Sequence, residues 1–186
     1  MTTRSLLFLS ALSIAIPTFA SAEGELRLGV GAGAGAAGYD PCAYPFQSAP
    51  CDVPRTTTAG AAPLAFAGYR HIKPLRNGWA LRFGGVLSGL LVAPIADTRA
   101  SVFSGAGEFG VALGRYSLDG RAGLSRVRMT YDQMSGTAMT MMFGGTATAR
   151  LSSELAVFGR ADAHAMMHGS AAAVFVGLGL EWTPSI

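Results

Sequence analysis

The amino-acid sequence predicts an all-β fold, an eight-stranded antiparallel up-and-down transmembrane β-barrel that follows a cleaved signal peptide. Hydrophobic residues make up 50% of the chain and charged residues only 13%, whereas soluble domains usually carry about 25% charged residues. Beyond residue 22 no apolar run reaches the roughly 18 residues that a membrane helix needs. Apolar side chains instead alternate with glycine or polar residues, which is typical of strands. Because a bilayer tolerates only helices or closed sheets, these observations together favour a barrel.

The first 22 residues have the order of a secretory signal peptide. Arg4 is followed by the apolar run LLFLSALSIAI (6–16), by Pro17 and by the small residues ASA (20–22). A basic start, a short apolar middle and an A-x-A site are the features of a cleaved export signal. The short run and Pro17 argue against the alternative, an uncleaved membrane anchor. We therefore expect cleavage after Ala22 and one outer-membrane β-barrel domain over 23–186.

The charge distribution argues against a nucleic-acid partner. The chain carries 14 Lys+Arg against 11 Asp+Glu, a formal net charge of +3, and Lys73 is its single lysine. The basic residues are scattered and form no cluster of the kind that binds a phosphate backbone. The sequence therefore predicts no nucleic-acid partner, and it predicts no cofactor.

Eight alternating runs, separated by clusters of turn residues, mark the strands in chain order. They lie near residues 25–38, 58–71, 78–92, 101–117, 121–131, 137–151, 154–166 and 171–182. In the first and last runs an apolar face is opposed by a face of glycines. Pro63 in the second run suggests a bulge or a ragged end, because proline cannot donate to a strand ladder. Asp119-Gly120 is typical of a tight hairpin turn, here between the fourth and fifth strands.

The length of these runs favours membrane spans. Runs of roughly 10 to 14 residues exceed the ~5 to 6 that are usual in soluble sandwiches, but they fit tilted spans of ~9 to 11 residues with some overhang. The apolar faces are then expected to contact lipid, and the glycine faces to line a narrow interior. The alternative is a soluble periplasmic barrel that binds an apolar ligand, in which the apolar faces would point inward.

Aromatic residues gather near the expected strand ends and predict two girdles. With the mature N-terminus in the periplasm, four lie at the periplasmic strand ends and three near the opposite ends. These residues are Tyr69, Trp79, Tyr116 and Trp182 at the first level, and Tyr39, Phe103 and Tyr131 at the second. Membrane interfaces favour Trp and Tyr, whose rings are apolar at one end and polar at the other.

With this pattern the sequence resembles the small eight-stranded outer-membrane proteins of the OmpA-like and OmpX-like type. The resemblance covers 23–186 and rests on the strand pattern rather than on a specific motif. It implies a location in the outer membrane of a Gram-negative bacterium, contact with outer-membrane lipids and folding by the barrel-assembly machinery. One departure is that TPSI follows Trp182, whereas such proteins commonly finish on a terminal aromatic residue that the machinery reads.

The cysteines Cys42 and Cys51 lie in the turn-rich stretch DPCAYPFQSAPCD between the first two strands. In an exported protein two cysteines this close predict a disulfide, which the loop-entropy model values at about 2 to 3 kcal/mol. A metal site is the alternative, but two thiolates without a nearby histidine do not complete a tetrahedral shell. The loop over 39–57 is the longest external one, so we expect it to contact an unknown external partner.

The stretch HAMMH (164–168) contains soft ligands that could hold copper(I). His164, Met166 and His168 would share one face of a strand, while Met167 would point away. Methionine is also an ordinary apolar filler. The sequence therefore predicts no metal site. A copper(I) site at HAMMH (164–168) is the alternative.

A lipid A-modifying outer-membrane enzyme is a further alternative function. His168 and Ser170 in HGS, with Glu181 downstream, invite comparison with the His-x-Ser and Glu arrangement of the outer-membrane lipid A deacylases. In a hairpin, however, Glu181 would lie roughly 35 Å down the last strand at ~3.3 Å per residue. Because a triad requires hydrogen-bond contact between its members, we expect no enzymatic activity.

Eight charged residues on the faces opposite the lipid-facing ones are expected to form a network that plugs the interior. They are Arg82, Glu108, Arg126, Arg128, Arg150, Arg160, Asp162 and Glu181. An arginine on the lipid face costs ~2 to 4 kcal/mol near the midplane, and its planar fork can bond two carboxylates. Glu108 and Glu181 are the expected main counter-charges, whereas Arg99 and Arg121 are expected to extend from strand ends to the interface. The sequence thus predicts a structural or surface-interaction protein.

Overall fold

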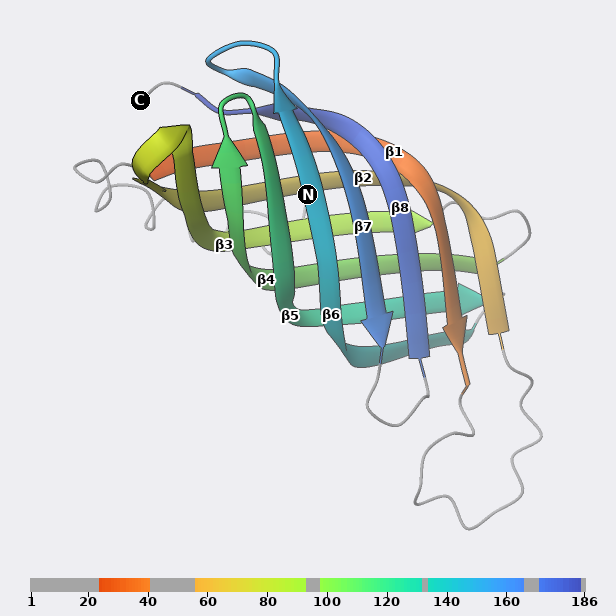
Figure 1. Ribbon diagram of the computed structural model, residues 1–186. Helices are drawn as coiled ribbons and strands as arrows, with labels where there is room; N and C mark the ends of the chain where they lie inside the picture. Colours follow the sequence, from red (N-terminus) through yellow and green to blue (C-terminus); the bar gives the residue numbers. More distant parts are fainter. Residues whose placement is uncertain (1–23, 41–55, 93–97, 132–133, 166–170, 185–186) are drawn as a thin grey trace, which may run out of the picture.

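The computed structural model describes residues 24–40, 56–92, 98–131, 134–165 and 171–184. They form one closed antiparallel β-barrel, in which each strand pairs with the next in the chain and β8 pairs with β1 (Figure 1). The elements are β1 (Gly24–Tyr39), β2 (Thr56–Pro74), the 3-10 turn η1 (Arg76–Gly78), β3 (Trp79–Val92), β4 (Thr98–Leu113), β5 (Tyr116–Tyr131), β6 (Met134–Arg150), β7 (Leu155–Ala165) and β8 (Ala171–Trp182). The predicted eight-stranded up-and-down fold is confirmed. Among these residues no helix is long and apolar enough to cross a membrane.

Several predicted features fall outside the described residues. The signal peptide, the pair Cys42 and Cys51 and most of the 39–57 loop are among them. So are residues 166–168 of the His/Met cluster and Ser170. These features stay predictions from the sequence.

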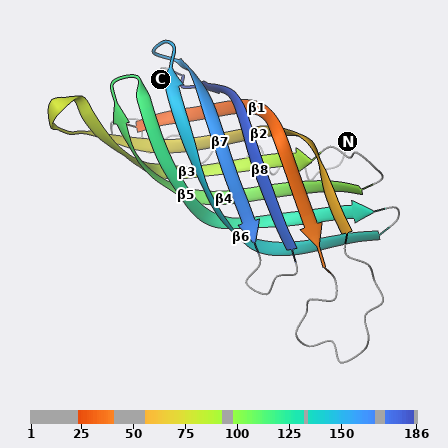
Figure 2. The ribbon, with the colours of Figure 1, turned by 45° about the vertical axis from the view of Figure 1, so that its right-hand side comes forward.

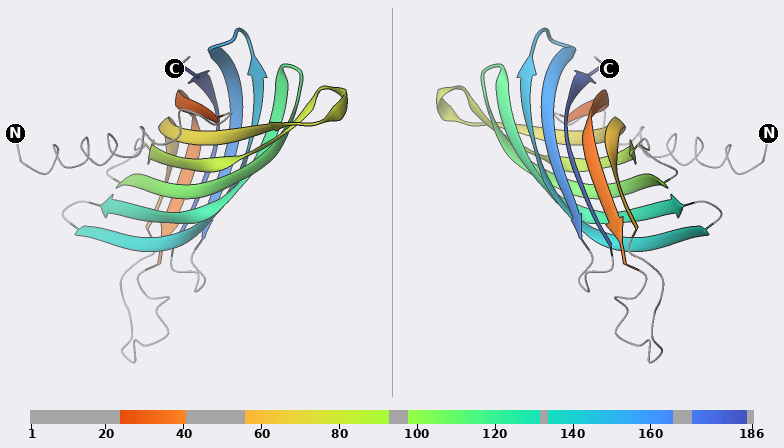
Figure 3. Two further views of the ribbon diagram at one scale, coloured as in Figure 1. Left: turned by 90° about the vertical axis from the view of Figure 1, so that its left-hand side faces the viewer. Right: turned by 90° about the vertical axis from the view of Figure 1, so that its right-hand side faces the viewer.

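One end of the barrel, which we call the turn end, carries the short connections. The turn at η1, residues 114–115 and residues 151–154 lie there, together with the start of β1 and the end of β8 (Figure 3). Main-chain hydrogen bonds close these turns, as between Leu75 N and Trp79 O at 2.7 Å. Because neighbouring strands alternate in direction, the position of a residue along its strand gives its height above the turn end.

The hairpin between β4 and β5 corrects the predicted turn. The turn consists of Gly114 and Arg115, whereas Asp119 and Gly120 lie inside β5. Gly114 has a φ of 56°, which suits the first central position of a type II′ turn and is readily adopted only by glycine. The Asp-Gly dipeptide is therefore part of a strand, where pairing with both neighbours overrides its local turn preference.

Pro63 is accommodated without the expected bulge. The register between β1 and β2 runs without interruption through Ala32 and Pro63. The register between β2 and β3 begins only at Leu64, opposite Leu90. The missing N–H of Pro63 therefore removes no donor from the β2–β3 ladder.

Large apolar side chains cover the outer face. The strands tilt, so that the near and far walls of the barrel cross in Figure 2. Leu178, Val176 and Val30 are the most exposed of them, at 72%, 65% and 64%. Charged side chains from the same strands, such as Glu181, point the other way and are buried. The alternative of a soluble barrel with inward-facing apolar surfaces is therefore wrong.

The glycine faces of β1 and β8 line the interior and make room for a phenylalanine. A Cβ added to Gly179 would lie 2.5 Å from Cζ of Phe158 and 2.7 Å from Cα of Gly31. It would lie closer still to the carbonyl oxygen of Val30. A Cβ on Gly31 would lie 3.0 Å from the same ring atom. Real Cβ atoms do not approach so closely, so the ring of Phe158 fits inside the barrel because both strands carry glycine there.

Candidate functional site

Charged side chains are buried in the interior near the turn end. Five arginines and four carboxylates of the described residues are buried there: Arg27, Arg70, Arg82, Arg121 and Arg160, with Glu108, Asp119, Asp162 and Glu181. Glu25 and Arg150 add one charge of each sign at the rim, where the Arg150 side chain is 38% exposed. We call these eleven residues the charge network. Each of the eight strands contributes at least one of them, so the network bridges the whole circumference.

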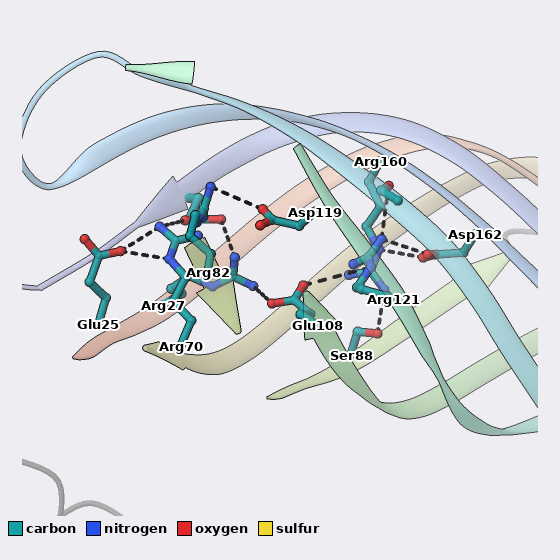
Figure 4. Close-up of polar contacts among 12 residues, drawn as sticks. Glu25, Arg27, Arg70, Arg82, Ser88, Glu108, Asp119, Arg121, Arg160 and Asp162 are labelled. Carbon is teal, nitrogen blue, oxygen red and sulfur yellow. Dashed lines mark hydrogen bonds and ion pairs between the residues drawn. The ribbon is translucent and has the colours of Figure 1, made fainter. Parts of the chain in front are cut away.

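One branch of the charge network leads from the rim to the middle of the barrel (Figure 4). Arg70 bonds Glu25 at 2.7 Å and lies 3.2 Å from Glu181. Glu181 lies 3.6 Å from Arg27, which donates from Nη2 to Oε2 of Glu108 at 2.5 Å. Alternating charges along this path let each carboxylate serve two arginines, as the planar guanidinium allows.

A second branch crosses to β7. Arg121 lies 4.0 Å from Glu108 and 2.8 Å from Asp162. Arg160 donates from Nε to Oδ2 of Asp162 at 2.5 Å and from Nη2 to Oγ of Ser88 at 2.8 Å. The strands that carry these residues, β4, β5, β7 and β3, are thereby joined across the lumen.

Arg82 and Asp119 form a further pair on the wall of β3 and β5. Nη1 of Arg82 lies 3.2 Å from Oδ2 of Asp119, and both side chains are buried. A single buried charge is costly because it leaves water, and removing one partner of a buried pair typically costs about 3 to 5 kcal/mol. Pairing therefore makes the charged interior tolerable, and it links strands that share no ladder.

A layer of hydroxyl groups lies farther from the turn end than the charges. Oγ of Ser88 and Oγ of Ser104 are 2.7 Å apart. Ser125 bonds Thr140 at 2.5 Å and Nδ1 of His164 at 2.8 Å. These polar groups are buried and hydrogen-bonded to each other, as buried polar groups generally are.

An apolar cluster is buried in the interior, and most of it lies farther from the turn end than the charges. Its members are Ala37, Ala62, Leu64, Phe66, Val86, Leu90, Val92, Ala100, Val102, Val127, Met129, Phe158, Ala173 and Phe175. Phe66 joins this cluster to the charges, because its ring packs edge-to-face on Phe158 at 5.3 Å while Arg27 and Arg160 lie 5.6 and 5.8 Å from its centre. We call these fourteen residues the apolar plug. The sequence did not predict this cluster. Both faces of the alternating runs contain apolar residues, so alternation alone does not show which of them lie inside.

Five of the eight predicted interior charges lie buried inside the barrel: Arg82, Glu108, Arg160, Asp162 and Glu181. Arg150 reaches the rim instead. Arg126 and Arg128 are exposed on the outer face, so their predicted inward orientation is wrong. β5 begins at Tyr116, and its odd-numbered residues point inward. Both faces of RAGLSRVRM carry apolar residues, so alternation alone does not assign them. Pairing with β4 places Arg121 opposite the inward-facing Glu108 and leaves Arg126 and Arg128 on the other face.

Five members of the network were not predicted from the sequence: Glu25, Arg27, Arg70, Asp119 and Arg121. Arg121 was expected at the interface, but it is 6% exposed and pairs with Asp162. Asp119 was assigned to a turn. Arg27 could have been found, because it lies on the glycine face of the first run. Arg70 lies at the end of the predicted run over 58–71, next to a stretch rich in turn residues, where the alternation assigns no face.

The predicted girdle residues lie near the strand ends. Trp79, Tyr116 and Trp182 are exposed at the turn end, at 44%, 56% and 47%. Tyr69 is half-buried near that end and packs edge-to-face on His71 at 5.2 Å. On the other side, Phe103 is 48% exposed, and Tyr39 and Tyr131 are the last residues of β1 and β5.

Several described residues are of the types that carry catalysis or bind metals, but they make structural contacts. Glu181 is 1% exposed and pairs with Arg27 and Arg70 near the turn end. Ser125 and His164 have the spacing of a hydroxyl and a base, but they are 1% and 2% exposed. In the described part of the chain no group of three or more His, Cys, Asp or Glu residues could hold a metal ion.

Solved structures of other proteins share this architecture. Ail, the attachment invasion locus protein of Yersinia pestis, is 13% identical with a TM-score of 0.52, over 87% of this chain and 99% of that one. Neisserial surface protein A is 12% identical with a TM-score of 0.52, over 86% and 97%. The N-terminal β-barrel domain of Pseudomonas aeruginosa OprF is 10% identical with a TM-score of 0.51, over 88% and 98%.

No protein-family model and no curated protein sequence matches this chain. At such low identities the likeness to solved structures establishes the fold. That fold, closed by eight antiparallel strands with an apolar outer face, is the fold of the small outer-membrane β-barrel proteins.

Proposed function

We propose that the chain is an outer-membrane β-barrel protein of a Gram-negative bacterium with a structural or surface-interaction role and without enzymatic activity. The observation that carries this proposal is the burial of the inward side chains: most members of the charge network lie buried towards the turn end, and most of the apolar plug is buried beyond them. An eight-stranded barrel is only wide enough for its own side chains. A protein of this kind acts through its surfaces rather than through a channel.

The orientation in the membrane follows from the lengths of the connections. Outer-membrane barrels have short periplasmic turns and longer external loops, so the turn end faces the periplasm. The 39–57 connection then lies outside the cell and is the proposed contact surface, held by a disulfide between Cys42 and Cys51. Two similar structures belong to an attachment invasion protein and to a surface protein, and these names fit a role in external contacts. Outer-membrane lipids and the barrel-assembly machinery are the other proposed partners.

Conductance in planar bilayers tests the closed interior. The purified protein should show no steady open conductance, because the charge network and the apolar plug fill the lumen. A known porin, reconstituted in the same bilayers, controls for insertion, because its conductance shows that barrels insert under these conditions. A stable porin-like conductance of the wild-type protein would contradict the proposal. It would indicate that the protein functions in passive diffusion.

The absence of enzymatic activity is tested with lipid A as substrate. When purified wild-type protein is incubated with lipid A in micelles, the mass of the lipid A should stay unchanged. Conversion that is lost in the Ser170→Ala variant would overturn the proposal and favour the lipid-modifying alternative.

A further inference from the structure

Two outward arginines on β5, Arg126 and Arg128, mark a boundary on the outer surface. From Tyr116 to Leu124 the outward side of β5 carries only apolar or glycine residues, and both arginines follow directly. A tilted span needs about ten residues, so a span that begins at Tyr116 ends near Arg126. Phe103 is the register partner of Arg126 on β4 and belongs to the outer girdle. The two arginines therefore lie at the level where lipid headgroups begin.

Further polar groups surround Arg128 on the neighbouring strands. Ser101 of β4 and Thr137 of β6 are its register partners on either side, and both are exposed. Arg99, also exposed, is the next outward residue of β4 beyond Ser101. Such diagonal neighbours lie about 7 to 8 Å apart. Two hydroxyl groups and three guanidiniums thus face outward together, and we call Arg99, Arg126 and Arg128 the basic patch.

In the part of β3 to β6 that the structure describes, the basic patch has no acidic neighbour on the outer surface. Among the described residues of β3, β4, β5 and β6, every carboxylate points into the barrel. The arginines of the interior pair with Glu25, Glu108, Asp119, Asp162 and Glu181, whereas no described carboxylate on these four strands shares the face of the basic patch. A membrane-facing surface with uncompensated positive charge attracts anionic lipid headgroups.

A groove beside the basic patch offers space for an acyl chain. It has a volume of about 440 Å³ and is lined by Gly89, Leu90, Leu91, Ser101, Val102, Phe103, Arg126 and Arg128. A second outer groove, of about 370 Å³ next to Trp182, is lined by apolar residues and glycine alone. Only the first of these two grooves combines apolar walls with cationic groups, which line its side on β5.

We propose that the basic patch binds the phosphate group of a phosphorylated lipid in the external leaflet. Guanidinium forks bond phosphate oxygens in pairs, which makes arginine suited to this task. The hydroxyls of Ser101 and Thr137 donate further hydrogen bonds, and one acyl chain lies along Phe103 in the groove. This inference rests on the proposed membrane placement and on the turn end facing the periplasm.

Native mass spectrometry in detergent micelles, with lipid A as the probe, tests the site. The Arg126→Gln/Arg128→Gln variant should bind lipid A about twenty-fivefold more weakly than the wild type, because each arginine near a charged lipid surface contributes about fivefold. Arg115→Gln is the matched control, since Arg115 is an exposed arginine at the turn end. It should retain the wild-type affinity within about twofold. The faster migration of unheated protein on gels shows that each variant is folded.

Two further probes separate the lipid from a free anion. Lipid A without its phosphates should lose the preference for the wild type, and inorganic phosphate should not compete at the same phosphate concentration. Equal lipid A affinity in the wild type and the double variant would overturn the proposal. So would wild-type protein that binds dephosphorylated lipid A as tightly as it binds lipid A. Efficient competition by inorganic phosphate would replace the lipid site with a site for soluble anions. Recovery of the protein from the soluble periplasm without detergent would instead overturn the membrane placement itself.

Discussion

Arg27 and Glu108 lie 2.5 Å apart across the lumen of the barrel. Their strands, β1 and β4, are not neighbours in the sheet, so the contact crosses the interior rather than running along the wall. Both side chains are almost inaccessible, at 2% and 4% exposure. The pair therefore fixes two opposite parts of the wall relative to each other, and Glu108 also lies 4.0 Å from Arg121.

Replacing Glu108 by alanine should destabilise the barrel by about 3 to 5 kcal/mol, because Arg27 and Arg121 would keep buried charges without their shared carboxylate. The free energy of unfolding can be measured by urea titration in detergent micelles. Lys73→Ala is the control, since Lys73 is exposed, and it should change the stability by less than about 0.5 kcal/mol. Similar losses in both variants would show that Glu108 has no special role in the network.

The coupling of Arg27 and Glu108 can be separated from their individual effects. A double-mutant cycle of Arg27→Met and Glu108→Gln should give a coupling energy of about 1 to 3 kcal/mol, because the two side chains are in direct contact. The same cycle between Arg27→Met and Lys73→Ala should give additive values within about 0.5 kcal/mol. A coupling near zero in the first cycle would be incompatible with the observed pair.

Gly179→Ala should destabilise the barrel by about 1 to 3 kcal/mol, because the new methyl group would overlap the ring of Phe158 and the backbone of Gly31. Gly120→Ala is the matched control, since its Cβ would lie 3.7 Å from the nearest atom, the carbonyl oxygen of Phe109. Urea unfolding measures both. A tolerated alanine at position 179 would contradict the close approach of Gly179 to the backbone of β1 and to Phe158.

Phe175→Ala tests the apolar plug. Phe175 is 1% exposed, and deleting a buried phenylalanine ring typically costs about 3 to 5 kcal/mol. Phe109→Ala removes the same ring from the outer face, where Phe109 is 62% exposed and detergent tails can fill the space. We expect the loss for Phe175 to exceed the loss for Phe109 in micelles. The reverse order would contradict a packed lumen.

The disulfide between Cys42 and Cys51 remains a prediction from the sequence. Mass spectrometry of the non-reduced mature chain should find it lighter than the reduced chain by two hydrogens. Cys51→Ser should leave the barrel folded, because the bridge closes a loop outside the strands. Two free thiols in protein taken from cells would refute the bridge.

The number of strands, the membrane-facing surface and the glycine-lined interior could be predicted because they follow from local alternation. A run such as VFVGLGLEW assigns its own faces, since every second residue shares an environment and Glu181 cannot face lipid cheaply. The same rule correctly placed Arg82, Glu108, Arg160 and Asp162 on inward faces. It also indicated that the barrel would be narrow.

Where both faces of a run contain apolar residues, alternation alone does not say which side is inside. In β5 the sequence RAGLSRVRM allows either assignment, and only pairing with β4, through the turn at Gly114, decides that Asp119 and Arg121 point inward and that Arg126 and Arg128 point outward. Arg70 was hidden for a similar reason, because β2 extends to Pro74 into a stretch that resembles a loop.

The sequence by itself therefore determined that this chain closes an eight-stranded barrel in a membrane, since strand periodicity and the scarcity of charge are local properties. Only the tertiary structure decided which charges meet. Arg27 and Glu108 come from strands that are distant in the chain, and their contact depends on the closure of β8 onto β1, which brings every strand around one lumen. The apolar plug arises for the same reason, because inward residues of different strands form one cluster only when the sheet is closed.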